Sequence, residues 1–185
     1  MNSNYIDWFP ILPFIPNKKE KTILELGCGL GTKKLCEEFE RVLSFETSRS
    51  DEWYVKTTKD LESFQNWRGH FKSFDHYGFS DSDPKLLSSN GLTRDLTPLD
   101  LYITELESFV DLSEVDVGFI DQGFHLRGET VNFLMSKGIP FIFLHDLNES
   151  PQLYGWNLIE FEKYNYEGAV SISSRQGTLL LKKNK

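Results

Sequence analysis

Apolar and polar positions along this chain fall into blocks that predict strands and helices in turn. Residues 22–26 and 42–45 are short apolar runs, typical of strands buried on both faces. Between them Leu35, Cys36 and Phe39 fall at helical spacing, with charged residues in the intervening positions. A strand, a loop, a helix and a second strand form a βαβ unit, so the two strands are expected to run parallel.

Strands and helices continue to alternate in the second half of the chain. The further elements are strands at residues 115–120 and 140–144 and helices at residues 99–110 and 129–137. Residues 170–173 and 178–181 flank the turn at 175–177 and predict an antiparallel hairpin that closes the sheet. The pattern predicts an α/β fold: a doubly wound, mostly parallel sheet with a C-terminal antiparallel hairpin and helices on both faces.

The stretch from residue 47 to residue 114 is patterned less strongly. Residues 70–74 predict a third strand. Residues 75–97 are rich in Ser, Asp, Gly, Asn and Pro and predict loops.

The composition is that of an ordinary folded protein, with 39% hydrophobic and 26% charged residues. We expect residues 1–185 to form one domain, with a lead-in or lid over 1–21 and a core over 22–185. Three prolines interrupt the apolar lead-in, which lacks the basic start and cleavage site of a signal peptide. No apolar run approaches the roughly 18 residues of a membrane span. These features predict a cytoplasmic protein with no membrane partner.

The formal net charge of −8 is not offset by a dense stripe of lysine and arginine. Because binding to phosphates needs a concentrated positive face, we expect no nucleic-acid partner. Cys28 and Cys36 lie eight residues apart across a predicted loop and helix, and we expect both to be reduced thiols.

Three glycines, Gly27, Gly29 and Gly31, alternate between the first strand and the first helix. A turn at such a place lets a ligand meet backbone N–H groups and the positive end of the helix. Glycine is needed there where φ is positive or where a Cβ would block the ligand. Glu46 ends the second strand about 20 residues beyond the first glycine, where a carboxylate can accept hydrogen bonds from ribose hydroxyls.

The glycine spacing helps to distinguish between nucleotide cofactors. Dinucleotide sites favour G-x-G-x-x-G, whereas this loop reads G-x-G-x-G. The phosphate-loop sequence G-K-[ST] is absent, because Gly31 is followed by Thr32-Lys33. The spacing therefore speaks against an NAD-dependent oxidoreductase.

Residues 25–31, E-L-G-C-G-L-G, resemble motif I of the class I S-adenosylmethionine-dependent methyltransferases. Glu46 matches the acid at the end of their second strand, and the terminal hairpin resembles the reversed last strand of their Rossmann-like sheet. The adenine-contacting acid of that family has no clear counterpart, and Asp75 is the candidate. The cofactor site that we expect consists of Glu25, Gly27, Cys28, Gly29, Gly31, Thr32, Glu46 and Asp121.

A second group of polar residues follows the strands at 115–120 and 140–144. Ligands of an open α/β sheet lie outside the carboxyl ends of its strands, so this group is expected near the glycine loop. His125 is the first candidate for a general base and His145 the second, because a histidine can take a proton near neutral pH. The candidate catalytic residues are His125, Asp121, His145 and Arg127.

Asp121 and Asp146, with Asn148, offer the oxygen ligands that Mg²⁺ prefers. The pattern is similar to that of metal-dependent O-methyltransferases, which place acids at the ends of strands four and five. The D-G-x-H sequence of some methyltransferase-like relatives is lengthened here by one residue, over 121–125. The alternative for both acids is a structural role in helix capping and hydrogen bonding. Aromatic side chains that could wall a substrate pocket are Trp8, Phe9, Tyr154 and Trp156.

The resemblance implies a methyltransferase that transfers a methyl group from S-adenosylmethionine to a small-molecule acceptor, with oxygen as the nucleophile. The Asn/Asp-Pro-Pro-Tyr tetrapeptide of nucleic-acid amino-methyltransferases is absent, since residues 121–124 read D-Q-G-F. The alternative is an S-adenosylmethionine-binding sensor or assembly domain without transfer activity. Mg²⁺ is a candidate second cofactor.

Overall fold

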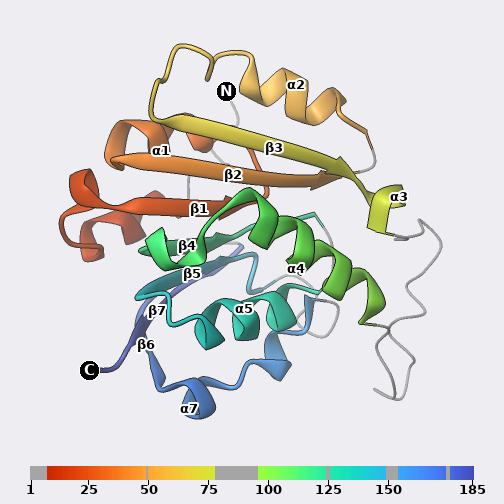
Figure 1. Ribbon diagram of the computed structural model, residues 1–185. Helices are drawn as coiled ribbons and strands as arrows, with labels where there is room; N and C mark the ends of the chain where they lie inside the picture. Colours follow the sequence, from red (N-terminus) through yellow and green to blue (C-terminus); the bar gives the residue numbers. More distant parts are fainter. Residues whose placement is uncertain (1–7, 49, 78–95, 124–125, 149–153, 174–175) are drawn as a thin grey trace.

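A computed structural model of the chain describes residues 8–48, 50–77, 96–123, 126–148, 154–173 and 176–185. A seven-stranded sheet forms its centre, in the order β3-β2-β1-β4-β5-β7-β6 (Figure 1). The strands are β1 (Thr22–Leu26), β2 (Arg41–Ser48), β3 (Trp67–Ser73), β4 (Val117–Ile120), β5 (Phe141–His145), β6 (Tyr166–Ile172) and β7 (Thr178–Lys183). The first five strands run parallel, whereas β7 is antiparallel to β5 and β6. This topology confirms the doubly wound sheet with a C-terminal hairpin.

Helices cover both faces of the sheet. Figure 1 shows α4 and α5 side by side over one face and α1 on the other. The helices are α1 (Thr32–Glu38), α2 (Glu52–Thr58), α3 (Phe74–Tyr77), α4 (Thr97–Phe109), α5 (Arg127–Ser136) and α7 (Phe161–Tyr164), with 3₁₀ segments η2 (Phe9–Phe14), η3 (Lys18–Glu20), η5 (Leu112–Glu114) and η6 (Trp156–Leu158). Within the described ranges, none of these helices has the length and apolar character needed to cross a bilayer.

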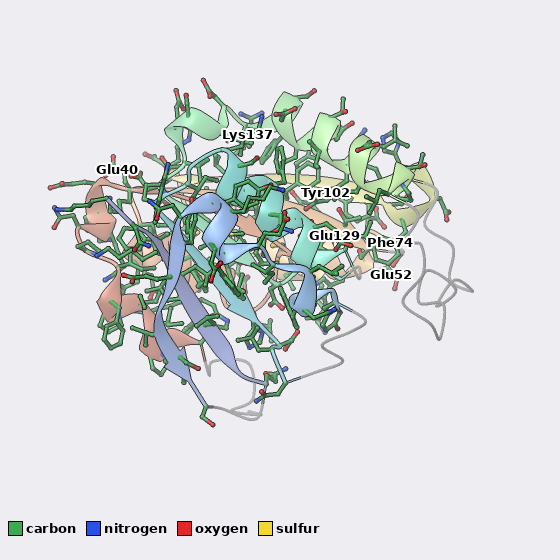
Figure 2. The ribbon with its side chains drawn as sticks, turned by 90° about the horizontal axis from the view of Figure 1, so that it is seen from below. Glu40, Glu52, Phe74, Tyr102, Glu129 and Lys137 are labelled. Carbon is green, nitrogen blue, oxygen red and sulfur yellow. The ribbon has the colours of Figure 1, made fainter. Side chains whose placement is uncertain are left out.

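Alternate residues of the central strands supply two apolar layers. In β1, Leu24 lies in the layer that Tyr102 of α4 completes, whereas Ile23 packs with Leu35 of α1. Tyr102, labelled in Figure 2, is fully buried in its layer. Since both faces are covered, the strands read as continuous apolar runs, as parallel strands usually do.

The region between residues 47 and 114 differs most from the prediction. Helix α2 was not predicted, because its apolar residues form no stripe in the sequence. In the structure Trp53 and Val55 of this helix are exposed. Strand β3 begins at Trp67, earlier than expected, and Phe74 opens α3 instead of ending the strand. Asp75 therefore lies in a short helix and not in a loop.

Candidate functional site

The sheet changes winding direction at β1, which pairs with β2 on one side and β4 on the other. Ligands of open α/β sheets bind outside the carboxyl ends of the strands at such a switch point. A pocket of about 270 Å³ lies there. Its lining includes the glycine loop 27–31, Glu46 after the centre of β2, Asp121 after β4 and His145 at the end of β5. The structure thus brings together four parts of the predicted site.

The three glycines of the loop serve different purposes. Gly27 has φ +100°, and a Cβ there would overlap the backbone carbonyl of Asp121. At Gly31 a Cβ would overlap the ring of Trp8. A Cβ on Gly29, by contrast, would meet no heavy atom within 4 Å. Gly27 and Gly31 are therefore required by the protein's own packing, whereas Gly29 leaves space for a ligand.

Three of the loop amides are already bonded within the protein. Gly27 N donates to Phe45 O at 3.0 Å, and Cys28 N donates to Glu46 Oε2 at 2.5 Å. Gly29 N donates to Thr32 Oγ1 at 3.0 Å. The expectation that a ligand meets bare amides is wrong for these three groups, because the Phe45 carbonyl and the Glu46 and Thr32 side chains already accept from them.

Glu25, in β1, holds the start of the helix that follows the loop. Its buried carboxyl group accepts hydrogen bonds from Ser44 Oγ at 2.6 Å and from Thr32 Oγ1 at 2.9 Å. Burial raises the pKa of Glu25 to about 8, opposed by these two hydrogen bonds and assisted by the charges of Asp121 and Glu46. The carboxyl group is therefore mostly protonated at neutral pH.

Replacing Glu25 by glutamine should remove a pH dependence of stability. Between its ordinary pKa and a folded pKa of about 8, Glu25 binds a proton in the folded state and not in the unfolded state, so wild-type stability falls as pH rises. Between pH 5 and pH 7 the wild type should lose about 2–3 kcal/mol of unfolding free energy that Glu25→Gln does not lose. Urea unfolding at both pH values measures this difference. Glu40→Gln, at an exposed position, is the matched control, and a Glu25→Gln profile parallel to the wild type would contradict the prediction.

Glu46 is 4% exposed and faces the pocket beside the loop. Burial is the largest cause that raises its pKa to about 7; the Cys28 amide opposes the shift, and the charge of Asp121 adds to it. Glu46 does not end the second strand as predicted, because β2 continues to Ser48 through its pairing with β3. Its carboxylate joins β2 to the glycine loop and also lines the pocket.

A second cluster joins the ends of β4 and β5 to the start of α5. His145 Nδ1 lies 3.2 Å from Asp121 Oδ1 and 3.3 Å from Asp146 Oδ1. Arg127 Nη1 lies 3.1 Å from Asp146 Oδ2 and 3.7 Å from Asp121 Oδ1, and it donates to His145 O at 3.3 Å. The predicted grouping of Asp121, Arg127, His145 and Asp146 is therefore present. His125, the first candidate base, lies outside the described residues.

Aromatic side chains cover the buried ion pairs of this cluster. Arg127 is 3% exposed, and its guanidinium carbon lies 4.0 Å from the ring centroid of Tyr154. Trp156 Nε1 donates to Asp146 O at 3.3 Å. Asp146 has φ +61°, and burial raises its pKa, assisted by the charge of Asp121. Tyr154, Trp156 and Arg127 thus position the groups that reach the pocket.

Solved structures share this arrangement of strands, although no protein-family model and no curated protein matches the sequence. Fibrillarin from Aeropyrum pernix, solved with natively bound S-adenosyl-L-methionine, superposes with a TM-score of 0.58 and 11% identity over 90% of this chain and 68% of that one. An rRNA methylase from Streptococcus thermophilus gives 0.52 and 12% identity over 91% and 89% of the two chains. This chain has the Rossmann-like fold of the class I methyltransferases.

A third structure with this methyltransferase fold comes from a different class of enzyme. It is phosphoethanolamine N-methyltransferase 1 from Haemonchus contortus, in complex with phosphoethanolamine and S-adenosylhomocysteine. The TM-score is 0.55 and the identity 15%, over 96% of this chain and 42% of that one. The fold is thus shared by proteins with different methyl acceptors.

Two tryptophans in the pocket wall were missed as cofactor-site candidates. Trp53 of α2 donates from Nε1 to Cys28 O at 2.8 Å and is 38% exposed beside the loop. Trp8, proposed only as a general pocket wall, lies against Gly31. Neither residue belongs to a recognisable motif, and the one sequence signal that could have indicated Trp53 is its closeness to Glu46. Asp75, the candidate for adenine, is not among the described residues of the lining.

Proposed function

We propose that this chain is an S-adenosylmethionine-dependent methyltransferase. The observation that carries the proposal is the charge of the glycine-loop pocket. Glu46 and Asp121 line it, the buried Glu25 beside them is mostly protonated, and the described part of the lining contains no lysine or arginine. Carboxylates would repel the pyrophosphate of a dinucleotide, and three loop amides are already used. A sulfonium nucleoside has the opposite charge, and its ribose hydroxyls can donate to a carboxylate.

The pocket residues fall into distinct roles under this proposal. Gly29 leaves room for the cofactor, and Glu46 accepts hydrogen bonds from its ribose. Glu25 and Thr32 hold the loop in shape, since both are engaged with each other and Thr32 with the Gly29 amide. Asp121 and His145 lie on the side of the pocket where β4 and β5 end.

We further propose that the acceptor is a hydroxyl group of a small molecule. Methyl transfer requires the nucleophile to be held in line with the methyl group and the sulfur, which proximity supplies. The oxygen attacks the methyl carbon, the carbon–sulfur bond breaks, and the hydroxyl proton passes to His145 Nε2. Asp121 holds the opposite ring nitrogen at 3.2 Å, which orients the ring and stabilises the imidazolium. The net charge of −8 favours a small molecule over a nucleic acid as acceptor.

Two experiments test this function. Native mass spectrometry of freshly purified protein should reveal bound S-adenosylmethionine or S-adenosylhomocysteine, and calorimetry should show binding of either but not of NAD⁺. Binding of NAD⁺ alone would overturn the proposal. Methyl transfer from labelled S-adenosylmethionine to fractionated small molecules and RNA identifies the acceptor class. The sensor alternative predicts that His145→Gln changes nothing in that assay, whereas an enzyme loses transfer and keeps cofactor affinity.

Glu46→Ala should weaken S-adenosylmethionine binding by about 1–3 kcal/mol, because charged hydrogen bonds to the ribose and to the loop are lost. Calorimetry measures the change in Kd. Glu52→Ala removes an exposed carboxylate from nearby α2 and is the matched control (Figure 2). An unaltered Kd for Glu46→Ala would remove Glu46 from the cofactor site.

Asp121, His145 and Asp146 are also the candidate ligands for a metal ion, since one ligand atom of each lies within 4.8 Å of the others. Arg127, however, already pairs with both carboxylates, and the Asn148 side chain lies against Gly177. Mg²⁺ takes oxygen ligands and water in preference to imidazole. The donor set fits Mg²⁺ poorly, and no step of the proposed transfer runs through a metal.

Millimolar MgCl₂ should therefore leave the Tm unchanged, and EDTA should leave cofactor affinity unchanged. Differential scanning fluorimetry and calorimetry check these expectations. A rise in Tm with MgCl₂ that Asp146→Asn abolishes would show that a metal binds at these carboxylates and would contradict the expectation.

A further inference from the structure

Trp8 occupies an unexpected place in the pocket wall. It precedes η2 in the lead-in, far in the sequence from the glycine loop, yet it lines the same pocket. The ring is 3% exposed and lies so close to Gly31 that a Cβ there would overlap it. Its centroid lies 4.9 Å from that of Phe119 and 5.8 Å from that of Phe143. These contacts fix the indole in one position at the wall.

The rings and the carboxylates of this pocket attract the same kind of ligand. Trp8 and Phe119 both line the pocket, and their ring planes meet at 54°. Aromatic faces carry negative potential and bind cations, tryptophan most strongly. The carboxyl groups of Glu46 and Asp121 line the same space. A positive charge in this space is therefore attracted by the rings and by the carboxylates, whereas a neutral sulfur at the same place lacks this attraction.

We propose that Trp8 is a specificity-determining residue, whose indole ring makes the pocket bind the sulfonium of S-adenosylmethionine more tightly than the thioether of S-adenosylhomocysteine. This inference rests on the proposed function. The two ligands have the same adenosine and amino-acid parts, so the ratio of their affinities isolates the charge at sulfur. Transfer of the methyl group removes that charge, and a pocket of this kind then favours release of the product.

Titration of the whole protein with both ligands tests the proposal. Trp8→Leu should weaken S-adenosylmethionine binding about tenfold and change S-adenosylhomocysteine binding less than about threefold. Trp8→Phe keeps a ring with a weaker face and should lose about two- to threefold for S-adenosylmethionine. Phe39→Leu truncates a buried ring of the same apolar layer outside the pocket, and it should leave the affinity ratio unchanged.

The outcomes separate the inference from the function on which it rests. An equal loss for both ligands in Trp8→Leu would show that Trp8 is only a structural wall and would overturn the inference. Should Trp8→Leu fail to fold, the wild type is titrated with an analogue that carries an ammonium group in place of the sulfonium. Tighter binding of that analogue than of S-adenosylhomocysteine, with a reduced ratio in Trp8→Phe, supports the inference; equal binding overturns it. A wild type that binds none of these ligands contradicts the proposed function itself.

Discussion

Replacing Gly29 by leucine is expected to abolish cofactor binding and to leave the fold intact. The φ of Gly29 lies outside the left-handed region, and a Cβ there meets no heavy atom within 4 Å, so the protein tolerates a side chain. That side chain extends into a pocket of about 270 Å³. A leucine would fill the part of the pocket nearest the loop, and S-adenosylmethionine affinity should fall more than about 100-fold, or about 2.7 kcal/mol.

Calorimetry and thermal unfolding of the same preparation separate the two effects. Kd should rise beyond the measurable range while the Tm stays within a few degrees of the wild type. Gly29→Ala adds one methyl group at the same position and should give an intermediate Kd. If Gly29→Leu binds S-adenosylmethionine as well as the wild type does, the cofactor does not pass over Gly29 and the proposed binding mode is wrong.

The central part of the fold could be predicted because its signals are local. An apolar run buried on both faces identifies β1 and β2, and the stripe that includes Leu35 identifies α1. Glu46 could be placed at the pocket because topology brings the carboxyl-terminal part of the neighbouring parallel strand beside the glycine loop, although β2 continues to Ser48. The same rule placed Asp121 and His145 at this edge, and the structure confirms that all three line one pocket.

The different surroundings of the three loop glycines could not be predicted. Gly27, Gly29 and Gly31 look equivalent in the sequence, but Gly27 faces the residue after β4, Gly31 faces Trp8 of the lead-in and Gly29 faces open space. The hydrogen bonds of the loop amides could not be predicted either, because they also depend on neighbours from other elements. Thr32 accepts from Gly29 and donates to Glu25, an arrangement that depends on how the helix start meets the strand.

The position of Arg127 also depends on tertiary packing. From the sequence it was a candidate catalytic residue, since it follows Asp121 in the same predicted loop. In the structure it opens α5, lies beneath Tyr154 and pairs with Asp146. Under the proposed function, a buried arginine that holds two carboxylates near His145 would act on the reaction through the position of that histidine. No local sequence pattern distinguishes that role from direct contact with substrate.

Gly27→Ala should have the largest effect on stability of any single substitution in the loop. Its φ of +100° is unfavourable for alanine, which costs about 1–3 kcal/mol. The new Cβ would also overlap the carbonyl of Asp121, and that strand end cannot retreat freely because Asp121 N donates to Leu26 O at 2.8 Å. Overpacking of this kind costs about 1–3 kcal/mol more. We expect a total loss of about 4 kcal/mol, a large share of the 5–15 kcal/mol typical of a domain.

Urea unfolding measures this loss, and Gly29→Ala, two residues away in open space, is the matched control that should stay within about 0.5 kcal/mol of the wild type. Gly27→Ala and Gly29→Leu should differ in which properties they change. Gly27→Ala displaces the end of β4, so stability and cofactor affinity should fall together, because Asp121 moves relative to His145. Gly29→Leu should reduce affinity alone. If Gly27→Ala unfolds at the wild-type urea concentration, the close approach of the loop to Asp121 is not a feature of the folded protein, and the pocket built on that approach is wrong as well.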